Sequence, residues 1–122
     1  MKLTTGVDLI DIDRMREAIE RHGERFVARV FTQAEQRDCG GRVSSLAARF
    51  AAKEATAKAL GCGIGDVSWL DIEIKSDENK APHLELHGEG ERLANQLGFS
   101  NWSVSMSHTE GQAMAFVVAI GE

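Results

Sequence analysis

Glu54 and Lys58 lie four residues apart in the segment 49–61, a spacing that can place a carboxylate and an ammonium group side by side. The segment is rich in Ala, Glu, Lys and Leu, which are strong helix formers, and Gly61 is a natural helix end. Residues four apart share one face of a helix, so the two charges can hold a metal ion and a phosphate together. The same spacing is also common on exposed helices, where it only stabilises them.

Asp8 is a second carboxylate in an unusual setting. Residues 2–10 predict a first strand, in which Val7, Leu9 and Ile10 are the apolar neighbours of Asp8. Aspartate is depleted in strands, and a carboxylate among apolar side chains costs free energy unless a partner compensates it. Asp8 is therefore a candidate site residue, unless it caps the following helix or faces water.

Lysine and arginine are concentrated in the first half of the chain. The whole sequence has a net charge of −5, which argues against a general nucleic-acid binder. Residues 14–58 nevertheless hold 10 Lys and Arg against 6 Asp and Glu, whereas residues 59–122 hold 3 against 10. The basic half is a candidate docking surface for an acidic partner protein, because opposite charges steer association.

A helix is predicted after Asp13, which is a plausible N-cap. Arg14, Arg21 and Arg25 return to nearly the same face at about 100° per residue, if the helix continues through Gly23. This row of arginines predicts the face that receives an acidic partner. The other interpretation is a solvated face on which nearby glutamates neutralise the arginines.

The remaining pattern predicts further helices and then mostly strands. Thr32 and Glu35 form a capping-box pattern that begins a short helix. The later elements are a helix at 44–60, strands at 67–75, near 84–86, at 102–107 and at 113–120, and a helix at 89–97. Helices in the first half and strands in the second predict an α+β fold with a largely antiparallel sheet.

Length and composition narrow the possible classes of protein. A chain of 122 residues predicts a single domain, 1–122, with one core. No apolar run approaches the roughly 20 residues that cross a bilayer, and no secretory signal pattern begins the chain, so we expect a cytoplasmic protein without membrane contact. Cys39 and Cys62 are too few and too unpatterned for a disulfide framework or a zinc site.

Two segments resemble the motifs of a known family. Gly6–Ile10, with Asp13-Arg14 after it, resembles the first motif of the 4′-phosphopantetheinyl transferases. Ala48–Ala55, followed by Lys58, resembles the second motif. The whole chain, as far as Ser107–Thr109, is similar to the short branch of that superfamily, the holo-acyl-carrier-protein synthases. The resemblance implies the phosphopantetheinyl transferase fold, assembled as a homotrimer with active sites between subunits.

The resemblance also implies an activity. Enzymes of this kind transfer 4′-phosphopantetheine from coenzyme A to a serine of apo-acyl carrier protein in fatty acid biosynthesis, releasing adenosine 3′,5′-bisphosphate. Asp8 and Glu54 would hold Mg²⁺, with Mn²⁺ as an alternative, and Lys58 would neutralise phosphate charge in catalysis. Either Glu54 or a metal-bound water would take the serine proton.

Further roles follow from the same resemblance. His108 and Thr109 follow a predicted strand, where an imidazole and a hydroxyl can contact a phosphate. The family assigns them, with Arg49 and with Arg42 less directly, to coenzyme A. It assigns the predicted docking face to the acyl carrier protein, through the residues Arg14, Arg21, Arg25 and Phe26.

Two other functional classes are also compatible with these residues. A non-enzymatic module that binds carrier proteins would keep the arginine face, but it would not need Asp8 and Glu54 to converge on one ion. A metal-dependent pyrophosphate hydrolase would keep the two carboxylates, but it would not need the basic helix.

Overall fold

A computed structural model describes the whole chain, residues 1–122. The elements follow in the order β1 Lys2–Asp11, α1 Ile12–Val30, α2 Gln33–Cys39, α3 Val43–Ala59, η1 Trp69–Asp71, β2 Ile72–Ser76, β3 Pro82–Leu86, α4 Gly88–Leu97, β4 Phe99–His108 and β5 Gln112–Gly121. Three of the four α-helices precede residue 60, and four of the five strands follow it. The predicted α+β class is confirmed.

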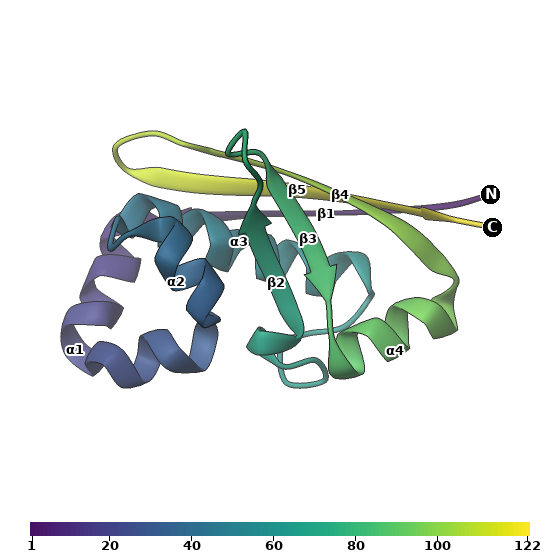
Figure 1. The fold of residues 1–122 in the computed structure, drawn as a ribbon, viewed down its shortest axis with the longest axis horizontal. Helices are drawn as coiled ribbons and strands as arrows, with labels where there is room; N and C mark the ends of the chain where they lie inside the picture. Colours follow the sequence, from purple (N-terminus) through teal and green to yellow (C-terminus); the bar gives the residue numbers. More distant parts are fainter.

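The strands form two antiparallel sheets. β1, β5 and β4 make a three-stranded sheet in that order, and β2 pairs with β3 in a separate hairpin. Figure 1 shows the three long strands as one layer, with the helices and the hairpin on one side of it. α3 packs against β1 and β5 and also contacts β2, so this helix lies between the sheet and the hairpin.

Alanine allows α3 to occupy this crowded position. Its buried residues are mostly alanines, and those nearest the sheet pack on the small residues Ala113, Ala115 and Val117 of β5. Small side chains on both surfaces let a helix approach a sheet closely. Ile72 and Ile74 of β2 fill the core on the other side of the helix.

Two predicted helix starts have different outcomes. The capping box is confirmed, because the Thr32 hydroxyl accepts from the backbone N–H of Glu35 and the Glu35 carboxylate accepts from that of Thr32. The prediction of Asp13 as an N-cap is wrong: the N-cap is Asp11, two residues earlier, and Asp13 lies in the first turn of α1. The reason is that β1 runs directly into α1, and the backbone N–H of Ile12 bonds the Gly111 carbonyl.

The predicted strand at 67–75 begins later than expected. Its first part is the 3₁₀-helix η1, which Ser68 and Asp71 cap reciprocally, and β2 starts only at Ile72. The apolar alternation that predicts a strand overlaps the Ser68–Asp71 capping pattern, and this pattern favours a turn because Ser and Asp side chains bond nearby backbone N–H groups. None of the helices is long and apolar enough to cross a membrane.

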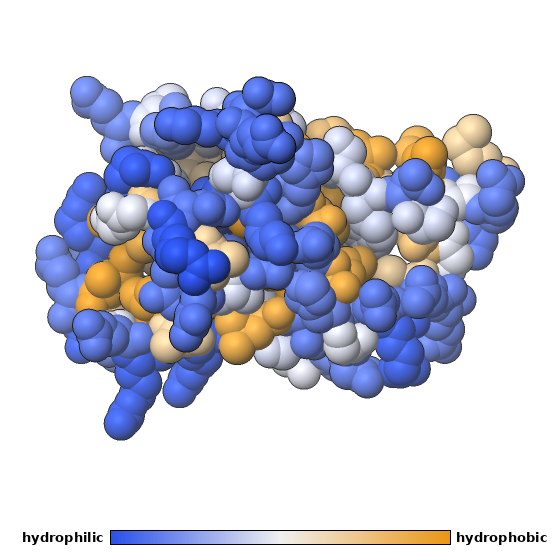
Figure 2. All heavy atoms as spheres, in the orientation of Figure 1, coloured by the Kyte–Doolittle hydropathy of each residue, from blue (hydrophilic) through white to orange (hydrophobic).

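The outer face of the three-stranded sheet carries exposed apolar side chains. Val7 is paired with Phe116 across β1 and β5, and the two are 49% and 41% exposed. The same face carries Leu3, Leu9, Met114 and Ile120, which are also exposed. In Figure 2, hydrophilic residues cover most of the visible side, and hydrophobic atoms reach the surface along the edge near the chain ends. An apolar area of this extent is typical of a protein–protein contact.

Candidate functional site

The contact between β1 and α3 brings charged residues from distant positions together. The Lys58 Nζ donates to the Asp8 Oδ1 at 3.0 Å and to the Val7 carbonyl at 3.0 Å. The Thr4 hydroxyl donates to the Ala59 carbonyl at 2.8 Å, which fixes the start of β1 against the end of α3. Asp8 is therefore held beside the last turns of α3. The lysine that it contacts, Lys58, is one helix turn from Glu54.

Glu54 is a half-buried carboxylate that no side chain pairs with. Burial raises its pKa, and the negative charge of Asp8 raises it further, while Lys58 opposes both. Glu54 lies one helix turn before Lys58, which contacts Asp8, so the two carboxylates face the same contact between β1 and α3. Two carboxylate groups with a single ammonium group beside them fit a hard divalent cation such as Mg²⁺, which takes oxygen ligands.

A cavity of about 420 Å³ opens next to Asp8. Its apolar wall includes Met15, Phe26 and Phe50. Arg14 adds a positive charge to the lining, so two residues of the predicted docking face reach the same cavity as Asp8. The cavity can accept an apolar chain next to a carboxylate site.

The other two predicted docking arginines are exposed on α1 but do not line this cavity. Gly23 has φ 66° and ψ −151°, which breaks the helical geometry between Arg21 and Arg25. The condition under which Arg25 would share a helical face with Arg14 and Arg21, a helix that continues through Gly23, is therefore not met, because helical periodicity does not carry across a kink.

A second group of cations lies around Arg49. Arg49 and His108 line a cavity of about 280 Å³ with Lys80, and Arg42 joins Arg49 and Lys80 in an adjoining cavity of about 520 Å³. The Arg49 guanidinium is nearly buried and donates to the Ile74 carbonyl and the Ser76 hydroxyl. Several cations around a hollow surface can bind a phosphate group.

Thr109 has a partly structural role. Its hydroxyl oxygen accepts from the backbone N–H groups of Gly111 and Gln112, which shapes the turn between β4 and β5. Thr109 shares a third cavity with His108, but it does not line the cavities around Arg49. None of these three cavities shares a lining residue with the cavity at Asp8.

One polar pair beside the site was not predicted. Lys53 precedes Glu54 in α3, and its ammonium group lies 2.8 Å from the carboxylate of Glu35, with both side chains fully buried. The sequence pattern indicated Glu35 only as a capping residue and gave no role to Lys53. The alanines at 51, 52, 55 and 57 around Lys53 were the one available sign that this part of the helix is covered.

Comparison with known proteins identifies the family of this chain. Residues 4–117 match the family model of the 4′-phosphopantetheinyl transferase superfamily. A holo-[acyl-carrier-protein] synthase from Herpetosiphon aurantiacus is 51% identical, over 98% of this chain and 99% of its own length. The synthase of the same name from Moorella thermoacetica is 47% identical, over 93% of this chain and 90% of its own.

Solved structures share the fold. The Helicobacter pylori holo-[acyl-carrier-protein] synthase in complex with coenzyme A has a TM-score of 0.87 and 35% identity, over 95% of this chain and 99% of its own. An ACPS–CoA complex from Chronobacterium ammoniagenes has a TM-score of 0.89 and 28% identity, over 100% and 99%. These matches confirm the resemblance seen in the two motifs. The chain therefore belongs to the 4′-phosphopantetheinyl transferase superfamily.

Proposed function

We propose that this protein transfers 4′-phosphopantetheine from coenzyme A to a serine hydroxyl of apo-acyl carrier protein, with Mg²⁺ as the metal ion. The relatives that bear the name holo-[acyl-carrier-protein] synthase match nearly the whole chain, which supports the assignment. The observation that carries it is the placement of Asp8, the unpaired Glu54 and Lys58 at one contact between β1 and α3.

Asp8 and Glu54 would hold the metal ion, since their mutual repulsion is relieved by a cation between them. Bound there, Mg²⁺ would supply charge neutralisation for the pyrophosphate of coenzyme A. Lys58 is 55% exposed at its side chain, so its ammonium group can turn from Asp8 toward a phosphate oxygen. Its role is to stabilise the charge that develops on the transferred group.

The serine oxygen of the carrier protein attacks the β-phosphorus of coenzyme A, and the bond from that phosphorus to the bridging oxygen breaks. The products are the serine phosphodiester and adenosine 3′,5′-bisphosphate. Glu54 is one candidate acceptor of the serine proton, although a carboxylate that holds a metal ion is a poor base. A metal-bound water is the alternative acceptor.

Binding of the two substrates is assigned to separate surfaces. Arg49, Arg42 and His108 line adjoining cavities and would hold the phosphates of coenzyme A, with Thr109 at the neighbouring turn. Arg14 and Phe26 would receive the carrier protein at the cavity beside Asp8. Arg21 and Arg25 would attract its acidic surface from farther along α1.

The homotrimer belongs to this proposal as well. The outer face of β1 and β5 is apolar and exposed in the single chain, and a subunit contact would cover it. The Asp8 cavity and the Arg49 cavities have no lining residue in common within one chain. Neighbouring subunits would bring the two kinds of site together, so that each active site lies between chains.

Intact mass of an apo-acyl carrier protein tests the reaction directly. The carrier is incubated with this protein, coenzyme A and Mg²⁺, with an EDTA control. Gain of one phosphopantetheine, about 340 Da from its covalent composition, only when metal is present is the expected result. Binding of the carrier without any mass gain would instead favour the binding module, and release of 3′,5′-ADP without modified carrier would favour the hydrolase.

A further inference from the structure

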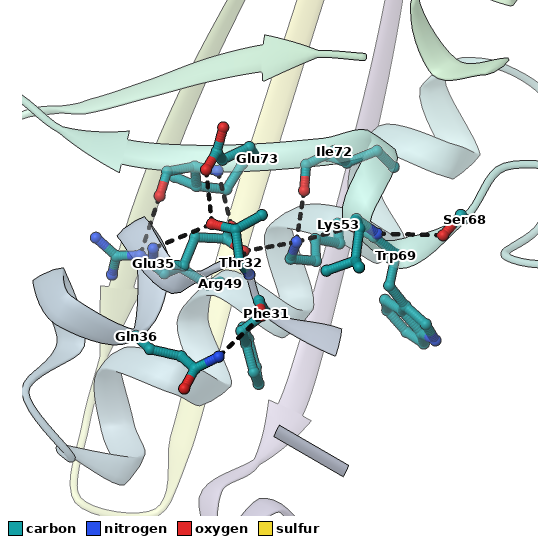
Figure 3. A network of polar contacts seen from close by, with 12 residues as sticks. Phe31, Thr32, Glu35, Gln36, Arg49, Lys53, Ser68, Trp69, Ile72 and Glu73 are labelled. Atoms are coloured by element: carbon teal, nitrogen blue, oxygen red, sulfur yellow. Dashed lines mark hydrogen bonds and ion pairs between the residues drawn. The ribbon is translucent and has the colours of Figure 1, made fainter. Parts of the chain in front are cut away.

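The ion pair of Glu35 and Lys53 lies entirely inside the protein. Both side chains are 0% exposed, and the Lys53 Nζ is 2.8 Å from the Glu35 Oε1. The same ammonium group donates to the Trp69 carbonyl at 2.9 Å and to the Ile72 carbonyl at 2.5 Å. Figure 3 shows these bonds converging on Lys53 from the start of β2 and from Glu35.

Glu35 extends the network on its other side. Its two oxygens accept from the backbone N–H groups of Thr32, at 2.9 Å, and Ile74, at 2.8 Å. The Thr32 hydroxyl donates to the Glu73 carboxylate at 2.6 Å. One continuous set of hydrogen bonds therefore joins α2, α3, η1 and β2 (Figure 3).

Stability alone is a weak reason for such a pair. Removing two charges from water costs several kcal/mol per ion, and well-packed apolar residues in their place are often neutral or stabilising. Burial lowers the pKa of Lys53, and the negative charge of Glu35 opposes that shift. A different role accounts better for the pair.

The surface of α3 explains what the pair can add. The buried face of this helix is built largely from alanines. Such small side chains interdigitate little with neighbouring elements, so they restrict the rotation and the axial position of the helix only weakly. Hydrogen bonds are directional, and three of them end on the single Nζ of Lys53. They fix the rotation of α3 where its apolar packing leaves freedom.

We propose that Lys53 and Glu35 are positioning residues, which hold α3 in the rotation that turns Glu54 and Lys58 toward Asp8. Lys53 and Glu54 are adjacent, so about 100° of helix rotation separates their side chains, and fixing one direction fixes the other. Lys53 points to the hairpin side of the helix, and Lys58 contacts β1 on the other. This inference rests on the proposed function, because the proposed function assigns catalytic roles to Glu54 and Lys58.

The test compares Lys53→Met with the double variant Glu35→Gln/Lys53→Met. The single variant leaves a buried carboxylate without its cation, so its Tm is expected to fall. The double variant removes that charge and is expected to recover most of the Tm. If the network positions α3, both variants show a kcat at least about 10-fold lower and a Mg²⁺ half-saturation raised several-fold, with less change in KM for coenzyme A.

Lys75→Met is the matched control, because Lys75 also pairs with a glutamate, Glu85, at 2.9 Å, but on the exposed face of the hairpin. It is expected to leave kcat and the Mg²⁺ half-saturation within about two-fold of the parent. A crystal structure of the double variant supplies a readout that needs no activity. It is expected to show the Lys58 Nζ displaced from its 3.0 Å contact with the Asp8 Oδ1.

Three results would overturn the positioning role: a folded double variant with parental kcat and Mg²⁺ response, an unchanged Lys58–Asp8 contact in its crystal structure, or a double variant that fails to fold. The last would mean that the pair serves folding itself. A parent protein that transfers nothing to any carrier would refute the proposed function instead, and the crystal structure would still decide the positioning role.

Discussion

Gly6 of β1 faces the carbonyl oxygen of Ala55 in α3 so closely that a Cβ on Gly6 would lie 1.9 Å from that oxygen. Real Cβ atoms do not approach a backbone oxygen to this distance, so only glycine fits without moving the strand or the helix. Gly6 is two residues from Asp8, and Ala55 follows Glu54. The close approach therefore sets the distance between the two proposed metal ligands.

Gly6→Ala is expected to destabilise the protein by about 1–3 kcal/mol, because the added methyl group forces β1 away from α3. Transfer activity should fall with it, since the same shift separates Asp8 from Glu54. Urea unfolding and the carrier mass assay measure the two effects. Gly63→Ala is the control, because nothing lies within 4 Å of its added Cβ. Equal stability of the two variants would contradict the close packing.

Glu54→Gln is expected to lower transfer by about 10²-fold or more, because the amide is a poor ligand for Mg²⁺ and a poor base. Its Tm should be unchanged or slightly higher, since burial and Asp8 disfavour the charged carboxylate in the folded protein. Glu91→Gln, at an exposed position of α4, is the control. Normal Mg²⁺-dependent transfer by Glu54→Gln would contradict the assignment of Glu54 as a metal ligand.

Reversal of charge at Arg14 and Arg21 together is expected to slow carrier association about 10-fold at low salt, with a smaller effect at high salt. Both side chains are exposed on α1 and would attract the acidic carrier. Turnover at saturating carrier should change little. Surface plasmon resonance at two salt concentrations measures the rate, and Arg92→Glu on α4 is the control. Unchanged association would remove the docking face from the proposal.

Phe116→Lys is expected to dissociate the proposed trimer, because it places a charge in the centre of the apolar outer sheet face. Light scattering after size exclusion should give the mass of three chains for the parent and of one chain for the variant. Activity should be lost with the trimer if each site needs two subunits. A parent protein that is monomeric at micromolar concentration would refute the trimer.

The contribution of Glu73 to the stability of the fold is expected to depend on pH. Burial raises its pKa, but hydrogen bonds from Thr32 and His87 outweigh this effect and hold the pKa below its ordinary value. A lowered folded pKa stabilises the protein above the ordinary carboxyl pKa of about 4.3, and the contribution disappears as pH falls through the folded value.

The measurable consequence is a difference between the parent and Glu73→Gln in the free energy of unfolding. The difference should be at full size at pH 5.5 and smaller at pH 3.5, because the carboxylate of the unfolded chain takes up a proton below its ordinary pKa of about 4.3. Urea unfolding at both pH values gives the comparison. A gap of the same size at both would show that charge on Glu73 is irrelevant to stability.

Local sequence patterns determined several elements. Alanine, glutamate and lysine in the segment 49–61 predicted α3, and Thr32 with Glu35 predicted the start of α2. These features depend on contacts within one helix turn, which neighbouring residues specify. The two motifs also indicated the family, and they singled out Asp8, Glu54 and Lys58 as candidate site residues.

Contacts between distant positions were decided only by the tertiary structure. The residue pattern singled out Lys58 and gave no role to Lys53, yet the structure shows Lys53 fully buried against Glu35 and Lys58 exposed beside Asp8. The packing of α3 between two sheets makes that difference, and no local pattern specifies which helix face each sheet will cover. The sequence by itself determined the helix and its charged residues, whereas the fold decided which charges meet, because burial depends on elements that are distant in the sequence.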